Sequence, residues 1–253
     1  MNIPTADSNY LLAGGAAELE RLRLQARVLE PDAEQMLDEI GVAAGWRCID
    51  LGCGGMGILG PLSRRVGNNG VVVGVDMDEK QLAAARQYVA ENGLTNVFID
   101  RQDAYATAQP CQSFDFVHVR FVFAPAGHDE SLLAEMLALA TPGGVIAIQE
   151  PDASSWTCYP SSPAWGRLKQ VILEAFRLGG GDFNVGQRTY AMLREAGLQD
   201  VHIRSSVIAL QGTHPYKRTP VQFAVSLRKR ILENDLISEA DLDRLSAEVE
   251  AIA

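Results

Sequence analysis

The sequence contains few cysteines, and their spacing excludes the usual structural roles of this residue. Four occur among 253 residues, and they form neither a Cys-x-x-Cys pair nor another spacing typical of metal ligands. A disulfide-stabilised secreted fold is therefore not expected, and we predict a reduced chain in the cytoplasm. The four are Cys48, Cys53, Cys111 and Cys158.

Long apolar runs, internal repeats and low-complexity tracts are also absent. No stretch approaches the roughly 18 consecutive apolar residues that a membrane-spanning helix needs. The N-terminus has no basic region followed by an apolar run, which a secretion signal would show. We therefore expect a chain that is neither exported nor inserted in a membrane.

Positively charged residues are also few in comparison with negatively charged ones. The chain has 22 Lys and Arg residues against 32 Asp and Glu residues, so its net charge is −10. A surface of this sign repels nucleic-acid phosphates and anionic lipids. The charge predicts a small-molecule partner with no nucleic acid and no membrane, and it leaves a homodimer open.

The most informative segment that is present runs from Cys48 to Gly57. It reads as a buried strand that enters a glycine-rich turn and then a helix, which lets the backbone approach a ligand closely. Gly52-x-Gly54-x-x-Gly57 has the spacing of a dinucleotide-binding turn. Asp50, two residues before the first glycine, would repel a pyrophosphate and favours a positively charged ligand.

Strand and helix patterns alternate along the chain. Residues 71–76 are almost continuously apolar, as in a parallel strand buried on both faces. The alternation predicts an α/β fold with a doubly wound, Rossmann-like, mostly parallel sheet. We expect strands at 47–50, 71–76, 96–100, 114–120, 144–150 and 200–210, and helices at 11–29, 32–40, 59–66, 79–91, 130–140, 189–196, 221–236 and 238–252.

The length fits a single α/β domain over residues 1–253. Within it we expect a helical cap over 1–40, in which Pro31 ends the first helix. The Rossmann-like core should cover 41–211, and a helical segment should cover 212–253.

Two acids follow the second and third predicted strands, where ligands of open α/β sheets bind. Asp76 ends the second strand and is placed to accept both ribose hydroxyls of an adenosine, in NAD or in another cofactor. The competing role, an N-cap of the next helix, suits Asp78 better. Asp103 lies in the loop after the third strand.

Four ordered motifs between residues 46 and 150 resemble one family. They are the hydrophobic-x-Asp-x-Gly-x-Gly segment at 48–54, the acid at Asp76, Ser-Phe-Asp-Phe-Val-His-Val-Arg at 113–120, and Leu-Ala-Thr-Pro-Gly-Gly-Val-Ile at 139–146. The chain is similar to class I S-adenosylmethionine-dependent methyltransferases, in particular the bacterial small-molecule type related to ubiquinone- and menaquinone-biosynthesis enzymes. Lead-in patterns at 10–22 and 186–193 extend the resemblance.

The resemblance implies the class I methyltransferase fold with N-terminal and C-terminal helical caps. It also implies methyl transfer from S-adenosyl-L-methionine to O, N or C of a small molecule, with S-adenosyl-L-homocysteine as product. Asp50 would bind the methionine portion, Asp76 the ribose and Asp103 the adenine. The full set of implied cofactor-binding residues is Tyr10, Asp50, Gly52, Cys53, Gly54, Asp76, Met77, Gln102, Asp103, Ala104, Arg120 and Phe121.

The acceptor side should be built by the loops after the fourth and fifth strands. A general base is needed only if the acceptor must lose a proton, and His128 is our candidate for that role. Arg120 and Glu150 are further catalytic candidates, and His118 reads as a buried, hydrogen-bonded core histidine. Trp156 and nearby aromatic residues read as a wall for an apolar acceptor. The acids form no convincing metal-binding set.

Two other functions stay open at this level. The literal GxGxxG turn permits an NAD-linked oxidoreductase, and a cofactor-binding regulator without catalysis is also consistent with the sequence. The resemblance further implies a seventh, antiparallel strand. The patterns after residue 210 are helical instead. Either that strand lies beyond residue 253, which is our expectation, or the analogy with the family ends here.

Overall fold

The computed structural model describes residues 16–253, with side chains from Glu18 onward, and these divide into two compact units. The sheet unit comprises residues 22–122 and 128–150, and the helical unit comprises the described residues 16–21, 123–127 and 151–253. Residues 151–211, which the sequence assigned to the core, thus belong with 212–253. The single domain over 1–253 stays a prediction.

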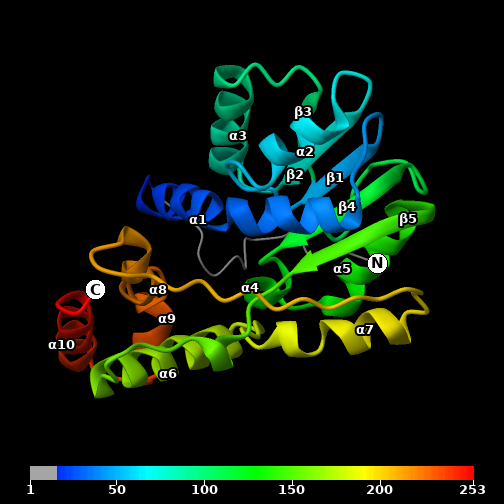
Figure 1. Cartoon of the computed structure of the whole chain (residues 1–253). Coiled ribbons are helices and arrows are strands. Elements are labelled where there is room, and N and C mark those ends of the chain that lie inside the picture. The colour runs from blue at the N-terminus through cyan, green and yellow to red at the C-terminus, as the bar shows by residue number, and fades with distance from the viewer. Residues whose placement is uncertain (1–15) are drawn as a thin grey trace. The chain divides into compact units, whose positions relative to one another are not determined.

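The sheet unit contains five parallel strands in the order β3-β2-β1-β4-β5 (Figure 1). This arrangement confirms the predicted doubly wound α/β fold, since the strand order reverses next to β1. Both β2 and β4 are buried along most of their length, which explains their apolar sequences. The strands are β1 (Arg47–Leu51), β2 (Val71–Asp76), β3 (Val97–Arg101), β4 (Phe114–Arg120) and β5 (Ala140–Gln149).

The helices of the sheet unit follow the predicted order. They are α2 (Leu59–Val66), α3 (Glu79–Glu91) and α5 (Asp129–Leu139), together with residues 22–40 of α1 (Ala16–Ile40). Side chains of α1, α2 and α3 share one hydrophobic core with the strands. Asp78 caps α3, as the sequence predicted, because its Oδ1 accepts the backbone N–H groups of the next helical turn.

The predicted helix end at Pro31 is wrong. Helix α1 runs without interruption through this residue to Ile40. Pro31 removes one helical hydrogen bond, but Ala33 and Leu37 on the following turns are fully buried. Packing of these side chains against the sheet core holds the second half of the helix in line with the first.

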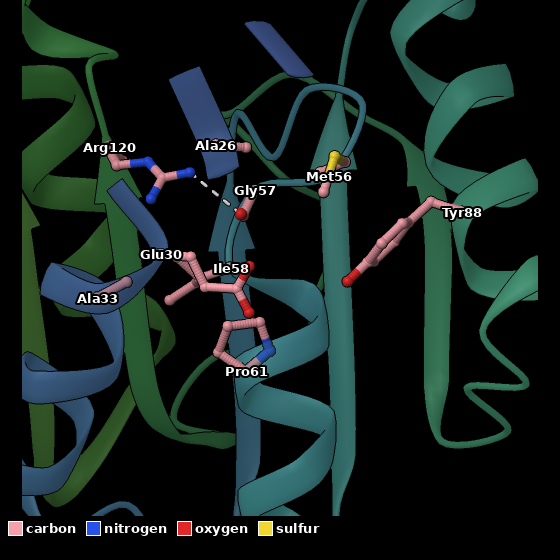
Figure 2. Close-up of a pocket in the computed structure, with 9 residues that line it drawn as sticks. All are labelled: Ala26, Glu30, Ala33, Met56, Gly57, Ile58, Pro61, Tyr88 and Arg120. Carbon is pink, nitrogen blue, oxygen red and sulfur yellow. Dashed lines mark hydrogen bonds between the residues drawn. The ribbon is translucent and has the colours of Figure 1, made fainter. Parts of the chain in front are cut away.

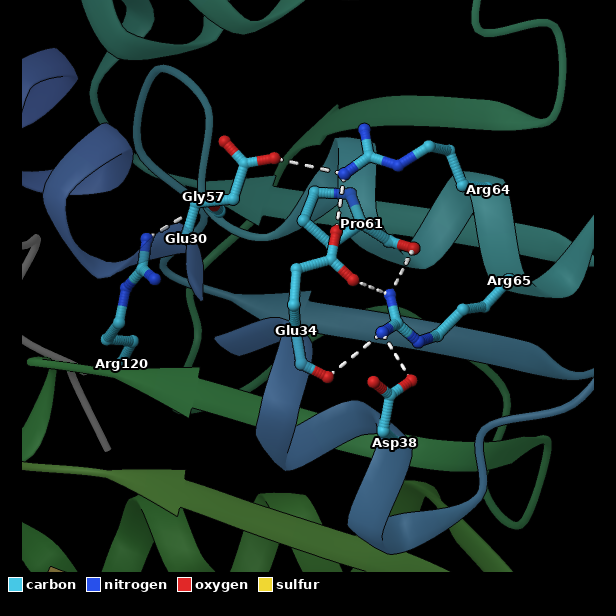
Figure 3. A network of polar contacts seen from close by, with 8 residues as sticks. All are labelled: Glu30, Glu34, Asp38, Gly57, Pro61, Arg64, Arg65 and Arg120. Carbon is cyan, nitrogen blue, oxygen red and sulfur yellow. Dashed lines mark hydrogen bonds and ion pairs between the residues drawn. The ribbon is translucent and has the colours of Figure 1, made fainter. Parts of the chain in front are cut away.

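An ion-pair network also joins α1 to α2 within the sheet unit (Figure 3). Arg64 contacts Glu30 at 3.0 Å and Glu34 at 2.5 Å. Arg65 pairs with Glu34 and also contacts Asp38 at 2.6 Å. The network holds α1 against α2, the helix that begins directly after the glycine turn.

The helical unit has its own hydrophobic core. Phe176 and Phe223 lie at its centre, with ring centroids 5.5 Å apart in an edge-to-face arrangement. The single helix predicted over 221–236 is wrong, because the chain forms two helices that meet at the buried Leu227. The helices are α4 (Phe123–Ala126), α6 (Pro163–Leu178), α7 (Thr189–Glu195), α8 (Thr219–Ser226), α9 (Arg228–Glu233) and α10 (Glu239–Glu250).

The strand predicted over 200–210 is also wrong. These residues form no ladder with any described strand, and Ile203 and Val207 are 67% and 76% exposed. Alternating apolar residues were the only signal for this strand. An extended segment becomes a β-strand only when its backbone groups form hydrogen bonds with a neighbouring strand. Among residues 16–253, no helix combines the length and apolar character required to cross a membrane.

Candidate cofactor and acceptor site

The glycine turn connects β1 to α2 and has a backbone shape that side chains oppose. Gly52, Gly54 and Gly57 have φ angles of +68°, +56° and +50°. A Cβ on Gly52 would lie 2.6 Å from a Val122 methyl carbon, so packing excludes a side chain there. A Cβ on Gly54 would meet only Gln81 Oε1, at 3.8 Å, so the backbone at Gly54 lies open on that side.

Side chains from three strands hold the turn in place. The Gly54 N–H donates to Asp76 Oδ2 at 2.9 Å, and the Ile58 N–H donates to Asp50 Oδ2 at 3.1 Å. On the remaining side, Arg120 Nη2 donates to the Gly57 carbonyl at 3.0 Å, a contact that Figure 2 shows. The turn is therefore fixed at its middle and at its junction with α2.

A small cavity lies against the turn (Figure 2), with a volume of about 10 Å³. This is room for about one water molecule, so it is far too small for an adenosine. It is lined by Ala26, Glu30, Ala33, Met56, Gly57, Ile58, Pro61, Tyr88 and Arg120.

Asp76 lies at the end of β2 with both carboxylate oxygens engaged. Oδ1 accepts the Asp78 N–H at 2.9 Å, and Oδ2 accepts the Gly54 N–H. Burial raises the pKa of this carboxyl, and the two N–H donors oppose that rise. Each oxygen keeps a second lone pair that a ribose hydroxyl can use. Met77, the next residue, is 43% exposed and offers an apolar surface beside it.

The loop after β3 continues the site. The Gln102 N–H donates to the Asp76 carbonyl at 3.1 Å, which joins this loop to the end of β2. Asp103 Oδ1 accepts the Tyr105 N–H at 2.9 Å, and Ala104 is buried between them. The structure thus brings together the acids after β2 and β3 that the sequence singled out.

Candidate acceptor-side groups gather at the ends of β4 and β5. Glu150 Oε1 accepts the Val122 N–H at 2.8 Å. The His128 ring stands edge-on to the Tyr105 ring, with centroids 6.2 Å apart. Burial raises the pKa of Tyr105, and the charges of Asp103, Asp129 and Glu150 raise it further. Tyr105 therefore lies in contact with His128 and within electrostatic reach of the three carboxylates.

Phe121, which the sequence assigned to the cofactor site, adopts a left-handed backbone conformation with φ of +56°. Its N–H donates to the Gln149 carbonyl at 3.0 Å, so the chain turns sharply where β4 ends. Asp50 and Cys53 are almost fully buried, at 2% and 3% exposure. Tyr10, the remaining cofactor candidate, lies outside the described residues.

The sequence interpretation of His118 has a clear outcome. His118 is fully buried and hydrogen-bonded, which confirms the core-histidine prediction. Trp156 is partly buried, and its ring packs edge-on against Trp165 beside the core of the helical unit. Its role as a wall for an apolar acceptor stays a prediction.

The sequence analysis did not identify some residues of the site. Gln81 is buried and its Oε1 has no hydrogen-bond donor among the described residues, although it faces Gly54. Gln149 and Tyr105 carried no motif either. Gln149 adjoins Glu150 and Tyr105 adjoins Ala104, so position next to predicted residues was the only available signal.

The residues around the turn fit an adenosyl cofactor. Gly54 provides a backbone approach that a Cβ would block, Asp76 provides spare acceptor capacity, and Gln81 Oε1 is a buried acceptor without a donor. In the part of the chain that the structure describes, no cluster of three or more His, Cys, Asp or Glu side chains is arranged to hold a metal ion.

Comparison with known proteins gives a consistent family. A model described as a methyltransferase domain matches residues 43–197. Nocamycin O-methyltransferase from Saccharothrix syringae is 30% identical over 186 residues, covering 74% of this chain and 59% of that protein. Demethylmenaquinone methyltransferase from Geobacillus kaustophilus is 26% identical over 198 residues, covering 73% of this chain and 85% of that protein.

Solved structures agree on the fold. The crystal structure of a SAM-dependent methyltransferase from Aquifex aeolicus aligns with a TM-score of 0.57 at 22% identity, covering 74% of this chain and 90% of that one. A putative sarcosine dimethylglycine methyltransferase from Galdieria sulphuraria aligns with a TM-score of 0.56 at 16% identity, covering 96% and 86%.

Proposed function

The chain belongs to the methyltransferase domain family, and from this premise we propose that it transfers a methyl group from S-adenosylmethionine to a small organic molecule. The observation that carries the proposal is the 2.9 Å bond from the Gly54 N–H to Asp76 Oδ2. It places the open backbone of the glycine turn beside the acid that ends β2. A ligand that contacts the turn therefore reaches a carboxylate suited to ribose hydroxyls.

The bound cofactor supplies an electrophilic methyl group on a sulfonium. In our proposal Asp76 accepts hydrogen bonds from the ribose, and Met77 covers one face of the adenine. Asp103 accepts from the adenine amino group, and Ala104 contributes its backbone N–H. The remaining cofactor residues of the sequence analysis, including Tyr10, keep their proposed roles.

Methyl transfer by direct displacement requires alignment above all, so the acceptor loops need mainly to orient the nucleophile and exclude water. His128 and Glu150 are the proposed proton acceptors, and Arg120 is a third catalytic candidate. The Tyr105 phenol beside His128 supports this assignment, because it adds a hydrogen-bonding group to the same cluster. Such a cluster suits an acceptor that loses a hydroxyl or amine proton.

The relatives support a small organic acceptor. They include enzymes named for nocamycin and for demethylmenaquinone, and the net charge of −10 disfavours a nucleic acid. Because the chain spans 59% of the nocamycin enzyme, the activity of the complete protein is part of this proposal. Cytoplasmic location and a homodimer also stay predictions.

Calorimetry and a transfer assay separate the three functions. We expect S-adenosylhomocysteine to bind with micromolar affinity and NAD to show no binding. NAD binding without S-adenosylhomocysteine binding would favour the oxidoreductase, which the relatives described above do not support. Incubation with methyl-labelled S-adenosylmethionine and a bacterial metabolite extract should yield a labelled small molecule. Cofactor binding with no labelled product from any extract would favour the regulator.

A further inference from the structure

Three polar side chains form a hydrogen-bonded row across neighbouring strands of the sheet unit. Asp50 in β1 lies opposite His118 in β4, and Gln149 ends the adjacent strand β5. His118 Nδ1 lies 2.7 Å from Asp50 Oδ1, and its Nε2 lies 3.1 Å from Gln149 Oε1. His118 is 0% exposed and Asp50 is 2% exposed, so water does not replace these bonds.

The row connects the glycine turn to the loop after β4. At one end, Asp50 Oδ2 accepts the Ile58 N–H at the start of α2, and a Cβ on Gly57 would collide with this oxygen. At the other end, the Gln149 carbonyl accepts the Phe121 N–H. A change in the carboxylate of Asp50 therefore acts directly on the turn that approaches the cofactor.

With a hydrogen on Nδ1, the His118 ring donates to Asp50 Oδ1. The other ring nitrogen, Nε2, can then donate to the Gln149 amide oxygen or, with the amide turned, accept from its NH₂. In both cases Nδ1–H donates to Asp50, which leaves Oδ2 free to hold the Ile58 N–H.

We infer that His118 is a positioning residue for cofactor binding. It holds the buried Asp50 carboxylate in the orientation that accepts the Ile58 N–H, and so fixes the glycine turn in its binding shape. The inference rests on the proposed function. It assigns Asp50 a second role, support of the glycine turn, in addition to the cofactor contact that the sequence suggested. His118 itself touches no cofactor atom.

Other ionisable groups near Asp50 do not replace His118. Burial raises the pKa of the Cys53 thiol, and the charges of Asp50 and Asp76 raise it further, so Cys53 stays neutral. Arg120 engages the Gly57 carbonyl from β4. Without the donor on His118, Asp50 Oδ1 loses its partner, and the carboxylate is no longer held in the orientation that accepts the Ile58 N–H.

The test compares His118→Leu with His118→Asn in the full chain. The asparagine NH₂ can donate from near the position of Nδ1–H, whereas leucine cannot donate. Calorimetry with S-adenosylhomocysteine should show that the leucine variant binds at least ~10-fold more weakly than the wild-type chain. The asparagine variant should keep most of the affinity.

Val117→Ala provides the matched control, because Val117 is fully buried in the same strand and its side chain has no polar atom to join the row. A purely structural role for His118 predicts that His118→Leu and Val117→Ala weaken binding in proportion to their loss of stability. Equal affinity loss in the leucine and asparagine variants, or wild-type affinity in the leucine variant, would overturn the inference.

Ring-nitrogen resonances of ¹⁵N-labelled histidine in the wild-type chain give a second readout, which stands even if a variant fails to fold. The His118 signal should show a protonated Nδ1 between about pH 6 and about pH 9. An unprotonated Nδ1 overturns the inference. A wild-type chain that shows this signal but binds no S-adenosylhomocysteine would instead refute the proposed function.

Discussion

Replacing Asp76 with alanine tests the cofactor site most directly. The change removes the acceptors of two backbone N–H groups, those of Gly54 and Asp78, each 2.9 Å away. Hydrogen bonds to charged groups contribute about 1.5–3 kcal/mol each, so the two bonds set an upper limit of ~3–6 kcal/mol on the loss in the free energy of unfolding. The desolvation cost of the buried carboxylate reduces this loss. Loss of the ribose contact should cost a similar ~1.5–3 kcal/mol in binding, or about 10- to 150-fold in Kd.

Asp78→Ala is the matched control for this prediction. Asp78 Oδ1 caps α3 through the N–H groups of Lys80 and Gln81, at 2.7 and 3.3 Å. Its removal should cost about 1 kcal/mol of stability and change the affinity for S-adenosylhomocysteine by less than about twofold. Urea unfolding and calorimetry measure the two quantities separately. An Asp76→Ala protein that binds with wild-type affinity would show that the ribose is held elsewhere.

The pH dependence of the same residue has a defined sign. Burial raises the folded-state pKa of Asp76 above 3.8, so the folded chain holds this proton more tightly than the unfolded chain. Its contribution to stability is therefore present at low pH and is lost as pH rises through the raised pKa. Binding changes in the opposite direction, because a protonated carboxyl accepts fewer hydrogen bonds. Asp76→Asn should abolish both pH dependences.

Three further predictions concern neighbouring features. Gly54→Ala should weaken S-adenosylhomocysteine binding more than tenfold (~1.4 kcal/mol). Gly52→Ala should chiefly lower the unfolding midpoint in urea, because a Cβ at this position has no room. Equal binding defects in the two variants would contradict this prediction. His128→Ala should lower turnover by about 100-fold with unchanged cofactor affinity in calorimetry, and full activity would leave alignment as the main mechanism. Burial raises the pKa of Glu34, but pairing with the arginines of α2 outweighs this effect and lowers the pKa below 4.5. The pairing therefore stabilises the fold above about pH 4.5, and this stabilisation is lost on further acidification. Arg65→Gln should therefore flatten the acid side of the stability curve measured by urea unfolding, and an unchanged curve would refute the assignment.

The strands of the sheet unit were predictable because burial on both faces leaves a plain mark on the sequence. Residues 71–76 are apolar apart from the glycine and the final acid, and β2 has these bounds in the structure. The helix after it was equally clear, since Asp78 and Gly93 mark its two ends. Local patterns were sufficient wherever they agreed with the packing.

Errors arose where tertiary contacts override local patterns. Pro31 is a strong local stop signal, yet burial of Ala33 and Leu37 carries α1 past it. Residues 200–210 show the alternation of a strand but no described strand pairs with them.

The acidic residues of the site were predictable from the sequence, but the residues that form hydrogen bonds with them were not. Asp50 and Asp76 follow from their places at the ends of parallel strands. The pairing of Asp50 with His118 depends on the register between β1 and β4, which sequence patterns do not specify. Gln149 and Gln81 carry no charge and no motif, so only the structure reveals their contacts.

The glycine spacing and the acids of the motif serve one physical purpose. Glycine adopts the three positive φ angles of the turn without steric strain but is flexible by itself. Here the turn is held by Asp76 from β2, by Asp50 from β1 and by Arg120 from β4. Because Asp76 both holds the turn and faces the ribose site, shaping the turn and binding the cofactor depend on the same carboxylate. This shared dependence gives a physical reason for the glycines and the strand-end acids to occur together. It also means that side chains of the sheet strands determine the stability of the turn.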